Sequence, residues 1–247
     1  MAGTPFRTAI LSALAEEQQG LLERLHAPQR VTRAGREFWR GELHGQPVVL
    51  ALSRIGKVAA ATTATTLIEA FGVTRLVFTG VAGGMGPGVN VGDVVVATGF
   101  VQHDMDASPI FPRYQIPLYG REHFSCDENL SAVLSNAARI GLAGIGSHTV
   151  HQGLIVSGDR FISAAHESLA LQQALAAAGH EPLAVEMEGA AVAQVCFDYG
   201  VPFAAVRTIS DRADDTAHVD FQKFVTEVAS RYALAIMEEF LAGLPSP

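Results

Sequence analysis

Cysteine is scarce in this chain of 247 residues, which contains only Cys126 and Cys196. Neither belongs to a C-x-x-C pair, so a disulfide scaffold is excluded and both thiols are expected to be reduced packing residues. The N-terminus lacks an apolar segment behind a basic start, and no apolar run approaches the roughly 20 residues that a membrane span needs. These absences predict a cytoplasmic protein that has no membrane partner.

Positive charge is also in short supply. Lys and Arg number 17 against 25 Asp and Glu, which gives a formal net charge of −8 at pH 7. A nucleic-acid-binding surface requires clustered Lys and Arg, so no nucleic-acid partner is expected. No repeat, low-complexity tract or linker divides the sequence, and a single domain over 1–247 is predicted.

Several motifs that would define other kinds of protein are missing. The glycine-rich stretch 80–92 contains no dinucleotide-binding G-x-G-x-x-G, and Ile55-Gly56-Lys57-Val58 lacks the Ser or Thr and the first Gly of a P-loop. No G-x-S-x-G elbow occurs. His103-Asp104-Met105-Asp106 resembles a metal patch but has no second ligand cluster, so neither a metal nor a cofactor is expected.

Apolar periodicity predicts alternating strands and helices. Predicted strands cover 8–14, 38–43, 47–53, 75–79, 93–97, 150–157, 183–185 and 203–209, with a hairpin turn at 44–46. One predicted helix follows the first strand, and others cover 58–70, 130–140, 164–178, 189–199 and 221–241. The glycine-rich loop 80–92 and the proline-containing segment 99–124 are expected to be irregular. This alternation predicts an α/β fold, a three-layer α/β/α sandwich around a central mixed β-sheet.

The glycines of 80–92 admit two interpretations. Tight turns account for Gly86 and Gly88. Close approach of the backbone to a flat ligand accounts equally well for Gly80, Gly83 and Gly84. The local sequence leaves both interpretations open.

What the chain does contain is a set of carboxylates that each follow a predicted strand. Glu188 and Asp211 follow strands 183–185 and 203–209, at the strand ends where α/β sheets bind ligands. Glu17 follows the first strand, although Glu16 and Glu17 could simply be favourable charges at the positive end of a helix dipole. Carboxyl groups whose pKa is raised by burial are common general acids and bases for glycosidic bonds.

Five segments together resemble one known family. They are R-I-G-K-V-A-A from residue 54, T-G-V-A-G-G from 79, G-L-I-V-S-G-D-R-F-I from 153, V-E-M-E-G-A-A-V-A-Q-V from 185 and V-P-F-A-A-V-R-T-I-S-D from 201. They are similar to the bacterial 5′-methylthioadenosine/S-adenosylhomocysteine nucleosidases of the purine nucleoside phosphorylase superfamily. The resemblance extends over about 8–241 and is weakest over 107–127. It implies a nucleoside phosphorylase-like fold, no cofactor, and hydrolysis that releases adenine from a small-molecule nucleoside.

The resemblance implies roles for the carboxylates. Glu17 would be the general base that activates water against C1′ of the ribose, and Asp211 would be the acid that protonates N7 of adenine. Ser210 would hold the carboxyl group of Asp211, and Glu188 would bind the ribose hydroxyls. Adenine leaves poorly until N7 is protonated, so acid and base need opposite protonation states, which two carboxyl environments can supply.

The resemblance also implies a set of binding residues. Met187 would pack against the sugar, Phe161 would stack on the base, and the backbone of Ile162 would read the edge of the base. The 5′-alkylthio group would lie among Ile55, Ile110 and Phe221. Other implied substrate-binding residues are Glu186, Val81 and Gly83. Pro117 would reach a neighbouring subunit, and the irregular apolar segment 110–119 predicts a homodimer.

Departures from the family pattern leave the preferred 5′ group open. Val81 replaces the usual Ser, which removes one polar contact near the sugar or the water, and Ala107 and Ile110 are smaller than expected. Among alternatives, a nucleoside phosphorylase would need arginines for phosphate, but Phe78-Thr79 stand where its Arg would be. A 6-amino-6-deoxyfutalosine nucleosidase uses the same acid and base and remains a close alternative. A non-catalytic nucleoside-binding protein is disfavoured because all three carboxylates are retained.

Overall fold

The computed structural model describes residues 7–145, 148–214 and 217–245. The predicted domain over 1–247 thus includes short segments, the first six residues among them, that lie outside the described residues. The strands are β1 Thr8–Ser12, β2 His26–Arg33, β3 Arg36–Leu43, β4 Gln46–Leu52, β5 Arg75–Gly84, β6 Val94–Gln102, β7 His123–Ser125, β8 Val150–Ser157, β9 Pro182–Glu186 and β10 Phe203–Asp211. The helices are α1 Ala15–Arg24, α2 Lys57–Phe71, α3 Glu128–Gly141, α4 Ala165–Ala177, α5 Gly189–Tyr199, α6 Ala217–Phe224 and α7 Ser230–Ala242. A π-helical turn, Val225–Ala229, joins α6 to α7.

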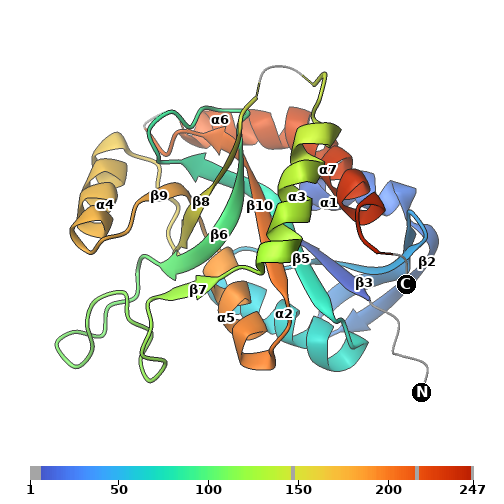
Figure 1. Ribbon diagram of the computed structural model, residues 1–247, viewed down its shortest axis with the longest axis horizontal. Coiled ribbons are helices and arrows are strands. Elements are labelled where there is room, and N and C mark those ends of the chain that lie inside the picture. Colours follow the sequence, from blue (N-terminus) through green and yellow to red (C-terminus); the bar gives the residue numbers. More distant parts are fainter. Residues whose placement is uncertain (1–6, 146–147, 215–216, 246–247) are drawn as a thin grey trace.

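A mixed ten-stranded sheet forms the centre of the described residues (Figure 1). Its strand order is β10-β6-β8-β9-β5-β1-β4-β3-β2; β7 pairs with β6, and β10 also pairs with β5. The strands β5, β10, β6, β8 and β9 therefore close into a ring, from which β1, β4, β3 and β2 extend as an open arm. The predicted mixed sheet with flanking helices is confirmed, and the partial closure is a feature that periodicity does not reveal.

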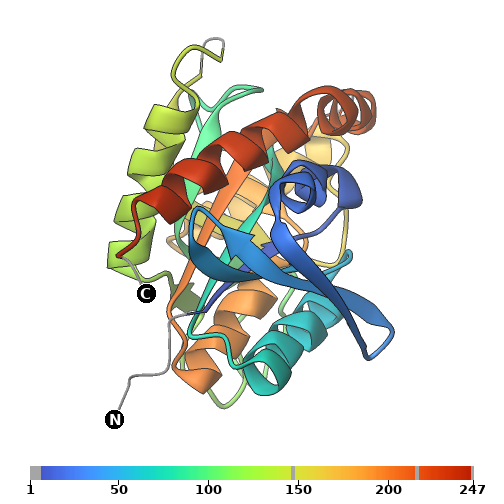
Figure 2. The ribbon, with the colours of Figure 1, turned by 90° about the vertical axis from the view of Figure 1, so that its right-hand side faces the viewer.

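Alternation along the strands divides the main core in two. In β1, Ile10 packs with the apolar residues of α1, α3 and α7, whereas Ala9 and Leu11 pack with those of α2 and α5. Figure 2 shows the same division, with α2 and α5 together below the sheet and α1, α3 and α7 on the opposite side, above it and to its left. Successive side chains of a strand point in opposite directions, so one buried strand contributes to both halves of the core.

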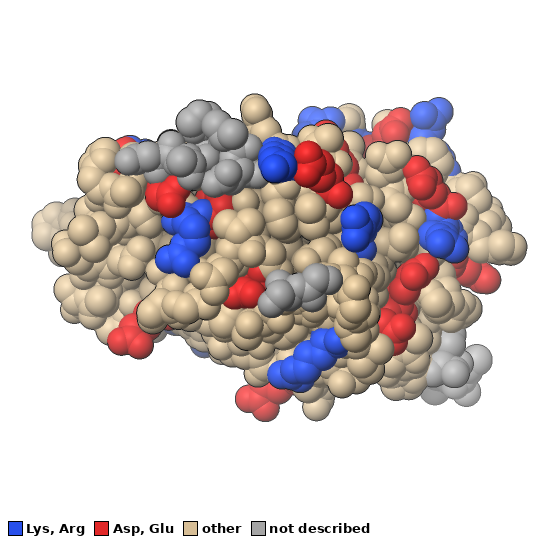
Figure 3. Space-filling view, turned by 90° about the horizontal axis from the view of Figure 1, so that it is seen from above, with Lys and Arg blue, Asp and Glu red and all other residues tan. Residues whose placement is uncertain are grey.

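The face of the described residues seen in Figure 3 carries both signs of charge. On the face seen in Figure 3, Lys and Arg lie among Asp and Glu. Cys126 and Cys196 are both buried and free, as predicted. No helix in the described ranges combines the length and the apolar character needed to cross a bilayer.

Most predicted elements are confirmed. Two of them, β8 and α5, have the predicted bounds, and the hairpin of β3 and β4 turns where expected. The strand β2 was not predicted, because its sequence HAPQRVTR is mostly polar and lies at the edge of the sheet. An exposed edge strand needs no apolar face, so apolar periodicity does not identify it.

The predictions of irregular structure are partly wrong. The strand β5 continues into the glycine-rich stretch as far as Gly84, pairing with β10 and β9, and β6 continues to Gln102 and pairs with β7. The closing helix begins at Ala217 and is interrupted by the π-helical turn. Backbone pairing within the ring stabilises these stretches, and it leaves no mark on the pattern of apolar side chains.

The last residue of α3, Gly141, lies where that helix crosses α7. A Cβ atom at Gly141 would be 2.4 Å from the carbonyl oxygen of Ala235 and 2.8 Å from its carbonyl carbon. Both atoms belong to the backbone of α7, which cannot rotate away as a side chain could. The absence of a side chain at Gly141 therefore sets how closely the two helices approach.

We expect Gly141→Ala to lower the free energy of unfolding by about 1–3 kcal/mol, because the methyl group overpacks the crossing. Alanine is otherwise the better helix former, by up to about 1 kcal/mol. Asn136→Ala, at an exposed position of the same helix, is the control and should be neutral or slightly stabilising. Urea unfolding followed by circular dichroism measures both; equal effects of the two substitutions would contradict the close crossing.

Candidate active site

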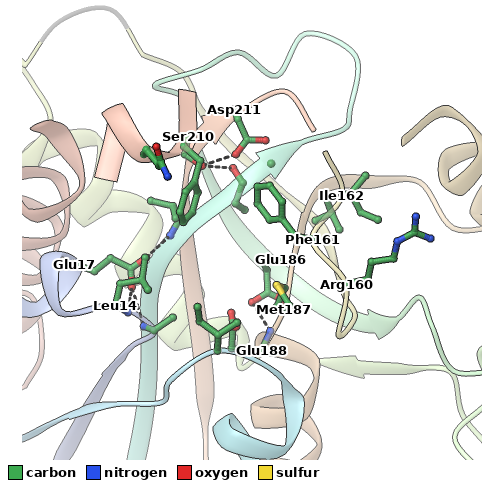
Figure 4. A pocket seen from close by; sticks show the side chains of 18 residues that line it. Leu14, Glu17, Arg160, Phe161, Ile162, Glu186, Met187, Glu188, Ser210 and Asp211 are labelled. Carbon is green, nitrogen blue, oxygen red and sulfur yellow. Dashed lines mark hydrogen bonds between the residues drawn. The ribbon is translucent and has the colours of Figure 1, made fainter. Parts of the chain in front are cut away.

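A cavity of about 460 Å3 opens where strands of the ring end and their following loops begin (Figure 4). It gathers residues from seven separate stretches of the chain. The predicted site residues that line it are Glu17, Ile55, Val81, Gly83, Phe161, Ile162, Glu186, Met187, Glu188, Ser210, Asp211 and Phe221. The remaining lining residues are Ala13, Leu14, Ala82, Arg160, Val185 and Gln222.

Glu17 lies in the first turn of α1, with its side chain buried beside the cavity. Its Oε2 accepts hydrogen bonds from the backbone N–H of Ala13 at 2.8 Å and of Leu14 at 2.9 Å, and its Oε1 accepts from the N–H of Val81 at 3.1 Å. Burial raises the pKa of Glu17, and these donors together with the charge of Arg207 offset part of the rise. Glu17 therefore both completes the start of its helix and places a carboxyl group at the cavity.

Asp211 ends β10 on another side of the cavity and is 2% exposed. The hydroxyl of Ser210 donates to its Oδ2 at 2.8 Å, and the N–H of Ala213 donates to its Oδ1 at 2.8 Å. Figure 4 shows Asp211 and Phe161 at one end of the cavity, with Glu17, Met187 and Glu188 toward the other. These two hydrogen bonds fix the orientation of the Asp211 carboxyl group.

Two of the glycines accommodate these carboxyl groups. A Cβ atom at Gly80 would be 3.1 Å from Oε1 of Glu17, and one at Gly83 would be 3.0 Å from Oδ1 of Asp211. Gly88 has a φ of 77°, as a tight turn requires, whereas a side chain at Gly86 would collide with Leu183. The turn interpretation is thus confirmed for Gly88, and close approach to protein carboxylates explains Gly80 and Gly83.

Glu188 follows β9 and is 6% exposed. Its Oε1 accepts a hydrogen bond from the N–H of Gly56 at 2.9 Å. Burial, and after it the nearby carboxylate of Glu186, raise the pKa of Glu188 to about 8. A carboxyl group held in this way remains able to accept hydrogen bonds from a bound polar ligand.

Glu186 lies against the cavity, but its oxygen atoms are engaged by the protein. Its Oε2 accepts from Nη2 of Arg207 at 2.8 Å, both oxygens accept from the N–H of Gly189, and Oε1 accepts from the hydroxyl of Ser157. Arg207 is 1% exposed and lies over the ring of Phe78, with 4.0 Å between the guanidinium carbon and the ring centroid. Glu186 and Arg207 therefore form a buried ion pair beneath the cavity.

Apolar side chains form the mouth of the cavity. The rings of Phe161 and Phe221 meet edge to face, with centroids 5.7 Å apart, and Phe161 is 42% exposed. Ile55, also at the mouth, is 56% exposed. Large apolar side chains exposed around a concave site are typical of a place where an apolar ligand group binds.

Ile110 is the one predicted site residue that does not line the cavity of its own chain. This residue lies between β6 and β7 and is 82% exposed. Figure 1 shows the segment between these strands extending away from the body of the molecule. Local sequence gives no sign of that direction, because the segment forms no helix and, apart from an isolated bridge between Ile116 and Arg121, no strand pairing.

Two arginines were missed by the sequence reasoning. Arg207 is the one charged residue in the apolar run 203–209, and a lone charge in a buried strand was the signal that could have identified it. Arg160 precedes the predicted Phe161 and lines the cavity, but Figure 4 shows its guanidinium pointing away, and it pairs with Glu167. The acidic patch at His103 is occupied by protein groups, since Asp104 pairs with Lys57 and accepts from the N–H of Asp159.

The chain matches the family model of the phosphorylase superfamily over residues 7–242, and it belongs to that superfamily. It is 38% identical over 231 residues to the 5′-methylthioadenosine/S-adenosylhomocysteine nucleosidase of Chromohalobacter salexigens. The aligned region covers 93% of this chain and 94% of that protein. Within the superfamily, the chain is a member of this nucleosidase family.

Solved structures support this family membership. The nucleosidase of the same name from Neisseria meningitidis, in complex with methylthio-immucillin-A, has a TM-score of 0.88 at 35% identity and covers 96% of this chain and 99% of that chain. The native futalosine hydrolase of Helicobacter pylori strain 26695 has a TM-score of 0.85 at 32% identity, with 97% and 98% covered.

We expect Glu188→Gln to be more stable than the wild type at pH 9 and nearly equal to it at pH 5. Folding raises the pKa of Glu188 from 4.5 to about 8, so the folded state binds more protons between these values and its stability falls as the pH rises through them. The side-chain oxygen of glutamine can still accept the hydrogen bond from the N–H of Gly56, but glutamine lacks the negative charge of the carboxylate. A pKa shift of one unit changes the free energy of unfolding by about 1.4 kcal/mol. A change of about 1 kcal/mol in that free energy shifts the Tm by about 2–4 °C in a chain of this size.

Thermal unfolding at pH 5 and pH 9 measures this difference. Glu16→Gln, an exposed substitution in α1, is the control and should follow the wild type at both pH values. A Tm difference between Glu188→Gln and the wild type that stayed constant from pH 5 to pH 9 would contradict the raised pKa.

Proposed function

We propose that this protein hydrolyses the N-glycosidic bond of 5′-methylthioadenosine and S-adenosylhomocysteine, releasing adenine and the 5-thio-substituted ribose. The observation that supports this most directly is the separation of carboxyl groups within one cavity. Asp211 lies with Phe161 at one end, and Glu17 and Glu188 lie toward the other (Figure 4). A purine base at the first end would bring its ribose to the second. The similarity to nucleosidases of this name, one of them solved with methylthio-immucillin-A, supports the same assignment.

In this proposal Asp211 is the general acid. Its proton passes to N7 of adenine as the bond between C1′ and N9 breaks, and the leaving base is neutral. Ser210 and the N–H of Ala213 hold the carboxyl group in one orientation. A fixed orientation matters because proton transfer requires hydrogen-bond contact in the reacting complex.

Glu17 is the general base. It takes a proton from the water that adds to C1′, so the hydroxyl group remains on the ribose and the proton remains on Glu17. The raised pKa of Glu17 makes it a stronger proton acceptor, and its backbone donors keep enough of the charged form for the reaction. Glu188 accepts hydrogen bonds from the ribose hydroxyls and, in its charged form, favours the positive charge that develops on the sugar.

The apolar mouth fits the sulfur substituent. Ile55 and Phe221 offer no polar side-chain partner for a 5′-hydroxyl, whereas burial of a methylthio group gains about 0.8 kcal/mol per methylene-sized unit. Substrates with a 5′-thio group are therefore favoured over adenosine. The two buried free thiols fit the reducing cytoplasm, where we place this reaction as a step of methionine salvage.

The experiment that tests the function measures adenine release from 5′-methylthioadenosine, with and without phosphate. We expect equal rates and free 5-methylthioribose as the sugar product, because phosphorolysis needs arginines that grip phosphate. Among the described residues that line the cavity, the one arginine is Arg160, and it points away. A phosphate-dependent rate with a ribose 1-phosphate product would establish a phosphorylase instead. Preferred cleavage of 6-amino-6-deoxyfutalosine would favour the activity suggested by the futalosine hydrolase similarity.

Substitution of the acid and the base should each abolish turnover without unfolding the protein. Asp211→Asn and Glu17→Gln keep the shapes of the side chains but cannot exchange the proton, so kcat should fall by at least ~10²-fold. Glu16→Gln changes the exposed neighbour of Glu17 and should leave kcat unchanged. If Asp211→Asn turned over at a nearly normal rate, Asp211 would have no part in the proton transfer.

We also propose that the protein is a homodimer whose partner covers the segment between β6 and β7. Ile110 and Leu118 in this segment are 82% and 92% exposed, which is unusual for large apolar side chains. Such a partner would also give Ile110 a role at the cavity mouth of the other subunit. Light scattering should give about twice the chain mass of 26.1 kDa, and Leu118→Glu should reduce it. A fully active monomer at micromolar concentration would refute the dimer.

A further inference from the structure

The side chain of Lys57 is largely buried, although it does not line the cavity. It is the first residue of α2, its side chain is 14% exposed, and Lys57 and Lys223 are the two lysines of the chain. Its Nζ contacts a carboxylate oxygen of Asp104, donates to Oε1 of Gln102 at 3.1 Å and lies 4.0 Å from Oδ2 of Asp159. A lysine placed in this way is fixed by charge on more than one side.

Lys57, Asp104 and Asp159, here called the Lys57 cluster, form a closed ring of interactions. The side chain of Lys57 pairs with Asp104, and the second oxygen of Asp104 accepts from the backbone N–H of Asp159 at 2.8 Å. Oδ1 of Asp159 accepts in turn from the backbone N–H of Lys57 at 2.7 Å. Each member therefore contacts both others, which distinguishes the cluster from an isolated surface pair of little energetic value.

The cluster joins two segments that carry cavity residues, and Gln102 links it to a third. Lys57 follows Ile55 at the mouth and Gly56, whose N–H donates to Glu188 at 2.9 Å. Asp159 comes two residues before Phe161. The bond of Gln102 to Lys57 continues through Gln102 Nε2 to Oε1 of Gln194 at 2.8 Å, in the helix that begins directly after Glu188.

Two glycines beside the cluster, Gly56 and Gly158, lie close to neighbouring side chains and leave little room for a side chain of their own. Gly56 has a φ of 95°, and a Cβ atom there would be 3.2 Å from Oδ1 of Asp159. A Cβ atom at Gly158 would be 2.3 Å from the imidazole of His103, which is buried beneath the cluster. The segments that meet at Lys57 are therefore packed at contact distance, and a shift of one would move the others.

We propose that Lys57 is a positioning residue for the proposed nucleosidase reaction. Through Asp104 and Asp159 it fixes Gly56, which orients Glu188 at the ribose, and the segment of Phe161 at the base. Without the ammonium group, the carboxylates of Asp104 and Asp159 would repel each other, and the start of α2 would separate from the segment after β8. This inference rests on the proposed function for its kinetic consequences, while the cluster itself is testable without any activity.

The kinetic test compares Lys57→Met with single and paired changes of its partner. We expect Lys57→Met to lower kcat/KM for 5′-methylthioadenosine by at least ~10-fold, chiefly through a higher KM, because small displacements of positioning groups have effects of up to ~10²-fold. Lys57→Met combined with Asp104→Asn should be more active than Lys57→Met alone, since the second change removes the repulsion. Arg30→Met, which breaks the exposed pair with Glu37, is the control and should stay within twofold of the wild type.

The proposal would be overturned if Lys57→Met lowered kcat/KM by less than twofold. It would also be overturned if the double variant lost more kcat/KM than the product of the losses of the two single variants. Should Lys57→Met fail to fold, Asp104→Asn alone serves the same purpose. That variant keeps an acceptor for the N–H of Asp159 and loses the charge opposite Lys57, so it too should raise KM.

Lysine labelling separates this proposal from the proposed function. In the wild type, acetylation with acetic anhydride should reach Lys57 at least ~10-fold more slowly than exposed Lys223, as measured by mass spectrometry of peptides. Asp104→Asn should increase labelling at Lys57 and leave Lys223 unchanged. Equal labelling of both lysines in the wild type would refute the cluster even if the protein cleaves the nucleoside, and a protected Lys57 in a protein without nucleosidase activity would refute the function alone.

Discussion

The buried charge of Arg207 is the constraint on which the site depends. Two carboxyl groups, Glu17 and Glu188, lie in one cavity, and burial raises the pKa of each. Arg207 opposes both rises, and it pairs with Glu186 at 2.8 Å while donating to the carbonyl of Phe78. The positive charge of Arg207 beneath the cavity favours the charged forms of both carboxyl groups, which are the forms that accept a proton or stabilise a cationic sugar.

The same ion pair ties the strands of the ring together at the site. Arg207 belongs to β10 and Glu186 to β9, and Ser157 at the end of β8 also donates to Glu186. Glu186 further accepts from the first N–H of α5, the helix that follows Glu188. Removal of one partner of a buried pair leaves an uncompensated charge, at a cost of about 3–5 kcal/mol. The geometry around Glu188 is thus set by charge beneath the cavity and by Gly56 beside it.

The cavity has a polar interior and an apolar mouth, and the two parts are positioned by different means. The interior groups lie on strand ends or at a helix start, where the backbone fixes them, as with Glu17 and its three N–H donors. The mouth consists of loop and helix residues such as Ile55, Phe161 and Phe221, and the Lys57 cluster connects the first two. A rigid interior suits proton transfer, and a mouth held from outside the cavity can admit substituents of different length.

Sequence by itself determined the order and kind of most elements, because burial of one face of a strand or helix leaves a periodic pattern in neighbouring residues. It also located Glu17, Glu188 and Asp211, since each comes within a few residues of a strand end. Tertiary structure alone decided that β10 pairs with β5 to close the ring, that Arg207 meets Glu186, and that Ile110 lies outside its own cavity. These features join residues from 21 to more than 100 positions apart, or depend on where an irregular segment points. A periodic pattern of apolar residues indicates which residues are buried. It does not identify the distant residues against which they pack.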